Sequence, residues 1–89
     1  MLSRTTFILS NSVEETAEYL ARMELCPKKH LHLVNVYNIY GCYRGHLVIL
    51  PGATLRRDYR DIINTANIHM FNFIRIKEDQ DVGEPAINN

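Results

Sequence analysis

The sequence lacks the features that mark several large functional classes. It has only two cysteines, Cys26 and Cys42, in 89 residues, too few for the disulfide framework of a small secreted domain. Ten basic and ten acidic residues give a formal net charge of zero, so no overall field attracts nucleic acid or an anionic membrane. The longest wholly apolar run, 47–51, is far too short to cross a bilayer, and the first five residues lack the apolar core of a signal peptide. We therefore expect a cytoplasmic protein.

Motifs that announce catalysis or cofactor binding are also missing. The chain contains no GxxxxGK(S/T) phosphate loop and no GxGxxG, GxSxG or HExxH motif. Its four histidines do not complete a zinc pattern with the two cysteines. The sequence therefore predicts no catalytic residues, no metal, no cofactor and no enzymatic activity.

The composition is that of an ordinary globular domain. Hydrophobic residues make up 46% of the chain and charged residues 22%, which argues against disorder. We expect a single α/β domain over residues 1–77, followed by an acidic C-terminal tail over residues 78–89. A net charge of zero also removes the repulsion that keeps small proteins apart, and so favours self-association.

The first half of the chain reads as strand, helix, strand. Residues 5–9 are β-branched and apolar, which predicts a strand. Ser12 and Glu15 have the spacing of a capping box, and apolar residues then recur at helical spacing as far as residue 25, before Pro27. Residues 31–36 are again β-rich and predict the second strand.

The second half predicts strand, helix, strand. Residues 46–50 form a continuous apolar run, which is typical of a strand buried on both faces. Apolar residues from 55 to 66 follow a helical period, and residues 70–76 read as the fourth strand. The fold class is therefore α/β: a small Rossmann-like β-α-β-β-α-β domain in two or three layers, with a mostly parallel four-stranded sheet and two helices.

The connection over residues 37–45 leaves one alternative open. Its nine residues are many for a hairpin turn but few for a crossover that contains a helix. A hairpin would make the second and third strands antiparallel. The continuous apolar run of the third strand favours the parallel arrangement.

One candidate site lies where the strands end, because open parallel sheets bind ligands at their carboxyl edge. Gly52 would let a ligand approach the backbone, the following helix start would attract an anion, and two arginines would add phosphate contacts. The competing interpretation is a chain turn, a helix cap and a solvated helix face. The predicted ligand-binding residues are Ser10, Asn11, Gly52, Thr54, Arg56 and Arg57.

A second candidate site is the loop that contains Tyr37, Tyr40, Tyr43 and Arg44. Tyrosines next to an arginine are enriched in protein interfaces, and they also stack on nucleic-acid bases. The competing interpretation is that two of the tyrosines tuck over the edge of the sheet. Because the net charge is zero, we predict that this loop binds a protein, either a partner or a second copy, and that nucleic acid is an unlikely ligand.

The histidines give a weaker signal. His30 and His32 share one face of the second strand, and His46 opens the third, but a metal site would need a further ligand and supporting residues. His69 precedes the fourth strand, and we expect it to face solvent.

The stretch Tyr40-Gly41-Cys42-Tyr43-Arg44-Gly45-His46-Leu47-Val48-Ile49-Leu50-Pro51-Gly52 resembles a segment of small phage-encoded Rossmann-like proteins. In these proteins Arg-Gly precedes a hydrophobic strand that ends in Leu-Pro-Gly. The layout is also similar to a degenerate nucleoside-triphosphatase core without its phosphate loop, in which acidic magnesium ligands would stand at Pro51 and Gly52. The Pro-Gly turn is similar to that of lysine-decarboxylase-like nucleotide-binding families, whose further glycines and catalytic acid are not matched by residues 53–55.

These observations predict a non-enzymatic interaction protein that self-associates or binds and inhibits a host protein. The resemblance implies a phage origin and hence the host cytoplasm. The alternative is a small nucleotide- or phosphate-binding module built on the Pro-Gly turn.

Overall fold

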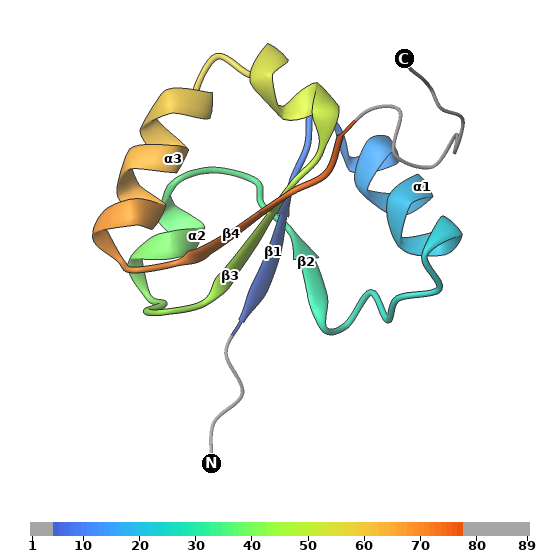
Figure 1. The fold of residues 1–89 in the computed structure, drawn as a ribbon, viewed down its shortest axis with the longest axis horizontal. Helices are drawn as coiled ribbons and strands as arrows, with labels where there is room; N and C mark the ends of the chain where they lie inside the picture. Colours follow the sequence, from blue (N-terminus) through green and yellow to red (C-terminus); the bar gives the residue numbers. More distant parts are fainter. Residues whose placement is uncertain (1–4, 78–89) are drawn as a thin grey trace, which may run out of the picture.

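A computed structural model describes residues 5–77, and the predicted acidic tail over residues 78–89 lies outside the described residues. Strands and helices alternate along the chain (Figure 1). The elements are β1 Thr6–Leu9, α1 Val13–Arg22, β2 His30–His32, α2 Tyr37–Tyr40, β3 His46–Ile49, the 3-10 helix η1 Pro51–Leu55, α3 Tyr59–Ile68 and β4 Asn72–Arg75.

The four strands form one sheet in the order β2-β1-β3-β4, and every neighbouring pair is parallel. Phe7 lies opposite Leu31 on one side and Leu47 on the other, and Leu47 lies opposite Phe73. Because β3 pairs with β1 and β4, the hairpin between the second and third strands is excluded. The predicted α/β fold with a parallel sheet is confirmed.

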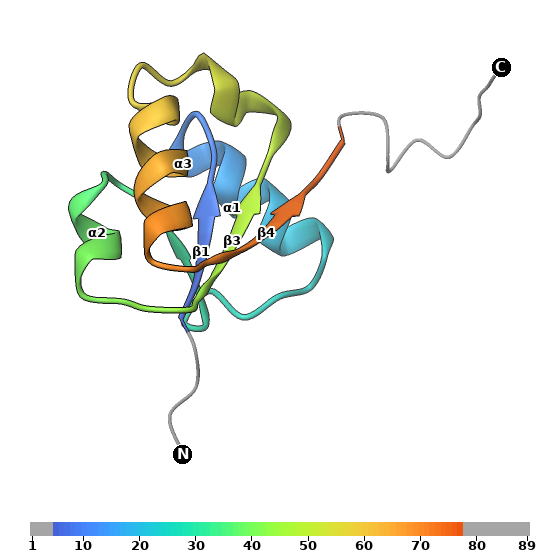
Figure 2. The same cartoon turned by 60° about the vertical axis from the view of Figure 1, so that its left-hand side comes forward.

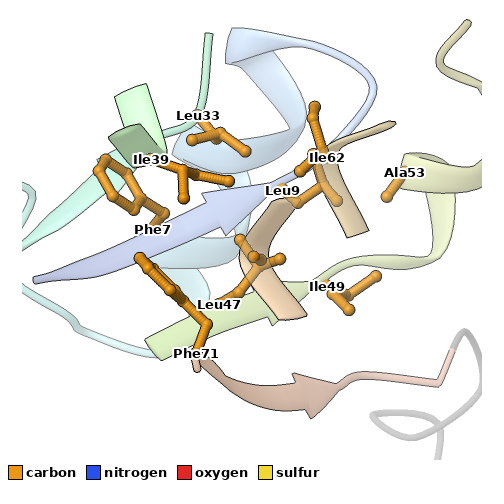
Figure 3. Packing of buried hydrophobic residues seen from close by; sticks show 10 residues of the cluster. Phe7, Leu9, Leu33, Ile39, Leu47, Ile49, Ala53, Ile62 and Phe71 are labelled. Carbon is orange, nitrogen blue, oxygen red and sulfur yellow. The ribbon is translucent and has the colours of Figure 1, made fainter. Parts of the chain in front are cut away.

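Helices cover both faces of the sheet, with α1 on one face and α2 and α3 on the other (Figures 1 and 2). The larger core lies between the sheet and the α2–α3 side (Figure 3). Alternate residues of β1 and β3 point into it, because successive strand side chains face opposite ways. Its fully buried members are Leu9, Leu33, Ile39, Leu47, Ala53, Ile62 and Ala66.

The α1 side has a smaller core. Tyr19 and Leu20 of α1 pack against Ile8, Val48 and Leu50 at the centre of the sheet. This single helix leaves the β4 flank of the same face less covered, and Ile74 is 40% exposed there.

The predicted second strand is too long, since β2 ends at His32. The chain turns after Leu33 because the Asn38 Oδ1 accepts the N–H groups of Val34 and Asn35, at 2.9 and 3.1 Å. The Asn35 side chain in turn accepts the N–H of Tyr37 at 3.0 Å. Asparagine side chains that bind nearby backbone in this way redirect a chain. They start the one-turn helix α2 inside the segment predicted to be a loop.

The two longer helices also differ from prediction at one end each. Helix α1 stops at Arg22, before Leu25, because Glu24 turns into the left-handed region (φ 56°) and the Leu25 N–H bonds to the Leu20 carbonyl. This is the Schellman pattern of helix ends. The predicted helix from residue 55 is split into η1 and α3 by extended backbone at Arg56, and Leu55 is 75% exposed, outside the core.

Within residues 5–77, no helix has both the length and the apolar character needed to cross a bilayer.

Candidate functional site

The carboxyl edge of the sheet is the place where doubly wound folds bind ligands. Strands β1 and β3 are neighbours at the centre of the sheet, and the chain leaves them in opposite directions, towards β2 and β4. Such a switch point opens a crevice at the strand ends. In this protein, several hydrogen-bond donors and acceptors at that edge already bind other groups of the same chain.

Arg56 is bound within the protein. Its guanidinium donates to the Ser10 and Leu33 carbonyls at 3.2 and 2.7 Å and to the Val34 carbonyl at 2.7 Å. Its remaining bonds go to the two Asp58 carboxylate oxygens, at 3.0 and 3.1 Å. Since a guanidinium has five N–H donors, these five bonds use all of them. Arg56 ties the ends of β1 and β2 together.

The backbone N–H groups of the same edge are also occupied. One oxygen of Glu15, in the first turn of α1, accepts the Asn11 N–H at 2.8 Å, and the other accepts the Gly52 N–H at 3.0 Å. A Cβ on Gly52 would lie 2.5 Å from the Glu15 carboxylate, so a larger residue here would displace this side chain from its present position. The predicted capping residue Ser12 does accept the Glu15 N–H, at 3.1 Å. Glu15 therefore sits where an anionic ligand was expected.

Ser10 is fully buried and belongs to a chain of side-chain hydrogen bonds. Its hydroxyl donates to the Ser12 carbonyl at 2.7 Å and lies 2.6 Å from the Thr16 hydroxyl, which lies 2.7 Å from His32 Nδ1. Each hydroxyl has one proton, so Thr16 must donate to Ser10 and His32 must donate to Thr16 through Nδ1–H. Burial, and secondly the charge of Arg56, lower the pKa of His32 from 6.5, while Glu14 opposes this shift.

A groove of about 820 Å³ opens beside this edge, between α1 and the ends of β3 and β4. Tyr19, Leu50 and Ile76 give it apolar walls. Its charged lining residues are two acidic and two basic side chains, Glu15, Glu18, Arg22 and Lys77, so the lining as a whole has no net charge that would attract a phosphate-bearing ligand. Of the predicted phosphate donors, Arg56 and the N–H of Gly52 have internal partners, whereas Thr54 and Arg57 are exposed.

The predicted partner-binding residues come together at the opposite end of the sheet. Tyr37, Tyr40 and Tyr43 are 70%, 56% and 61% exposed. The Tyr37 and Tyr40 rings meet edge to face with centroids 5.5 Å apart, and the Arg44 guanidinium lies 6.0 Å from the centre of the Tyr43 ring. The alternative interpretation places two tyrosines against the edge of the sheet. It does not fit, because all three tyrosine side chains are more than half exposed.

Two residues that the sequence analysis did not assign join this group. His69 follows α3, whose C-terminal end lies beside α2 (Figures 1 and 2). Its ring stacks on Tyr40 at 6.1 Å and meets Tyr43 edge to face at 6.3 Å. The Tyr43 hydroxyl donates to Met70 Sδ at 3.1 Å. We define the tyrosine surface as Tyr37, Tyr40, Tyr43, Arg44, His69 and Met70.

Backbone contacts fix the tyrosine surface from beneath. His69 Nδ1 donates to the Cys42 carbonyl at 2.9 Å, and the Arg44 N–H donates to the His69 carbonyl at 2.9 Å. His69 is therefore partly buried rather than simply solvent-facing. Arg44 and Met70 both have φ near 60°. Met70 takes this conformation as the Schellman end of α3, where the Phe71 N–H donates to the Ala66 carbonyl at 2.9 Å.

The remaining histidines have separate roles. His30 and His46 both lie opposite Thr6 in the sheet register, on either side of β1. His30 Nδ1 donates to the Cys26 carbonyl, and His46 contacts Asn72. Across residues 5–77, no group of three His, Cys, Asp or Glu side chains is placed to hold a metal ion.

No protein-family model, curated protein or solved structure matches this chain. The case for function therefore depends on the residues of the two ends of the sheet.

Proposed function

We propose that this protein is a non-enzymatic interaction protein that docks a protein partner, or a second copy of itself, on the tyrosine surface. The single observation that carries the proposal is the continuous ring contact from Tyr37 through Tyr40 and His69 to Tyr43, on rings that stay largely exposed. Inhibition of a host protein is the specific form of this proposal that the resemblance to phage proteins suggests.

The composition of the surface supports protein binding. Tyrosine and arginine are enriched among the residues that contribute most to protein interfaces, and methionine is enriched in interfaces generally. A ring that is already held by its neighbours loses little conformational entropy when a partner binds. Stacking on His69 and the bond from Tyr43 to Met70 provide this restraint.

The alternative function, phosphate or nucleotide binding at the Pro-Gly turn, has less support. The strongest donors expected there are Arg56 and the Gly52 N–H, and both bind groups of the protein itself. The Glu15 carboxylate of α1 accepts the Gly52 N–H at this turn, and its negative charge would repel a phosphate.

The test compares matched variants at the two ends of the sheet. Tyr40→Ala and Tyr43→Ala should abolish association, whereas Leu55→Ala, a change of an even more exposed apolar residue near the other end, should leave it intact. Sedimentation equilibrium measures self-association, and capture from extracts of the source cell followed by binding measurements with the purified partner measures hetero-association.

Circular dichroism confirms that each variant is folded. Association that survives both tyrosine changes would contradict the proposal. Loss of association in Leu55→Ala alone would move the interface to the other end of the sheet.

A further inference from the structure

Strand β4 forms an open edge of the sheet. It is the outermost strand on its side, and within residues 5–77 no element lies beyond it (Figure 2). The opposite edge strand, β2, has three residues, whereas β4 keeps an unbroken register with β3 over four. Proteins protect exposed edges with proline, lysine, bulges or covering elements. Residues Asn72–Arg75 contain no proline or lysine, and their pairing has no bulge. The β4 edge is therefore able to accept another strand.

The backbone groups on this open edge belong to Phe73 and Arg75. The N–H groups of Asn72 and Ile76 donate to carbonyl groups in and next to β3, at 2.8 and 2.9 Å. Because alternate residues of an edge strand turn their backbone groups to the same side, Ile74 also faces β3. The N–H and C=O groups of Phe73 and Arg75 thus point away from the sheet, where an added strand would bind them.

The side chains of β4 also suit an added strand. On the α1 face, Ile74 is 40% exposed, because the single helix there does not reach it. On the other face, the Arg75 guanidinium donates to the Tyr59 hydroxyl of α3 at 3.0 Å. A strand beside β4 would cover Ile74 while Arg75 keeps its contact with α3.

We propose that a second copy of this chain supplies that strand. The two β4 strands pair antiparallel across a two-fold axis at Ile74 and join the two sheets into one. In this register, Phe73 of each copy lies opposite Arg75 of the other, and each such pair exchanges two N–H to C=O hydrogen bonds. This inference rests on the proposed function in its second-copy form, and it adds the contact that joins the copies.

The neighbouring registers fit less well. An axis at Arg75 would place two like charges directly opposite each other, which destabilises a strand pair. An axis at Phe73 would need the Phe71 N–H, which already donates to the Ala66 carbonyl at 2.9 Å. An axis at Ile74 avoids both conflicts. It also brings the two exposed Ile74 side chains together on the same face of the joined sheet, so that each covers the other.

The charge distribution along the sequence favours a second copy over an unrelated strand. In an antiparallel pair, β4 of each copy runs towards the start of the other β4, which follows Met70 of the tyrosine surface. The sequence after Lys77 begins with Glu78 and Asp79, whereas residues 25–57 and 62–77 contain no acidic residue. Arg44 of the tyrosine surface therefore offers a cation to the acidic sequence of the other copy, and opposite charges favour this association.

Sedimentation equilibrium of the full-length chain and of matched edge-strand variants tests the pairing. We expect the unmodified chain to have the mass of two chains at about 0.1 mM. Ile74→Lys places like charges opposite each other at the axis, and it should weaken the dimer at least about tenfold. Leu31→Lys is the matched control, because Leu31 is a 43% exposed residue of the other edge strand, and it should leave the dimer intact.

A charge exchange separates loss of pairing from loss of folding. Ile74→Glu should also be monomeric by itself. An equimolar mixture of Ile74→Glu with Ile74→Lys should regain the mass of two chains, because opposite charges then meet at the axis. Unfolded variants would not recover in this way, and recovery requires position 74 of one copy to lie opposite position 74 of the other.

A monomeric unmodified chain, a dimer that persists in Ile74→Lys, or a mixture that stays monomeric would overturn the inference. The proposed function is tested separately by Tyr43→Ala. If Tyr43→Ala abolishes association but Ile74→Lys does not, the proposed function stands and the β4 pairing is wrong. If Ile74→Lys abolishes association but Tyr43→Ala does not, the β4 pairing stands and the tyrosine surface is not the docking site.

Discussion

Arg56→Met tests whether Arg56 is a structural residue or a ligand-binding one. Methionine keeps an apolar stem at a side chain that is only 12% exposed, but it removes the guanidinium that serves the Ser10, Leu33 and Val34 carbonyls. Leaving a buried carbonyl without its donor costs about 1–3 kcal/mol. The Ser10 and Leu33 bonds are partly buried, whereas the Val34 carbonyl can turn to water, so we expect a loss of about 3 kcal/mol.

Such a loss is large for a chain of this size, whose total stability at about 0.05–0.15 kcal/mol per residue is on the order of 10 kcal/mol. Urea unfolding followed by circular dichroism measures it. Arg57→Met is the matched control, because Arg57 is exposed and its replacement should change stability by less than about 0.5 kcal/mol. Equal effects of the two changes would refute the structural role. Stabilisation of the unmodified chain by inorganic phosphate, lost in Arg56→Met, would instead make Arg56 a ligand residue.

Three further predictions concern local features of the fold. Glu24→Gly should raise the unfolding midpoint by relieving a left-handed residue at the end of α1, about 1 kcal/mol, and a lowered midpoint would contradict this. Gly45→Ala should destabilise by about 2 kcal/mol, because the new Cβ would lie 2.5 Å from the Thr5 carbonyl oxygen and 2.9 Å from the Phe71 ring, and an unchanged midpoint would show that the chain relaxes there. The lowered pKa of His32 means that the unfolded chain binds a proton more readily than the native one, so stability should fall as the pH drops below 6.5 and level off below the native pKa. His32→Gln should reduce that slope in pH-dependent thermal unfolding, whereas His30→Gln should keep it because His32 is still present.

The sheet was predictable because its determinants are local. The apolar run before Pro51 and the β-branched start of the chain each specify a strand by composition, and strands separated by helical patterns favour parallel pairing. The connection between β2 and β3 was harder. Its helix α2 depends on two asparagine side chains that accept backbone N–H groups, and a periodicity argument does not include side chains of that kind.

The two candidate sites were predictable to different degrees. The tyrosines lie close together in sequence, so their clustering was visible, but His69 and Met70 reach them only through the packing of α3. At the other end, the helical pattern did not distinguish Arg56 from Arg57. Only the tertiary fold shows that Arg56 turns back to the strand ends, because the carbonyl groups that it binds are 22 to 46 residues away in sequence.

The state of Glu15 explains why we place function at the amino end of the sheet. Its carboxylate satisfies two backbone N–H groups at the switch point, in the position that a bound phosphate would take in related architectures. Phosphate should therefore leave the thermal midpoint of the unmodified chain unchanged. Glu15→Ala exposes both N–H groups and removes the repelling charge, so it should lower the midpoint, and phosphate should restore part of the loss if this edge keeps the geometry of an anion site. If phosphate raises the thermal midpoint of Glu15→Ala but not that of the unmodified chain, the Glu15 carboxylate occupies the anion site in the native protein. If phosphate instead raised the thermal midpoint of the unmodified chain, the carboxyl edge would be a ligand-binding site. The tyrosine surface would then not be the only functional site of the protein.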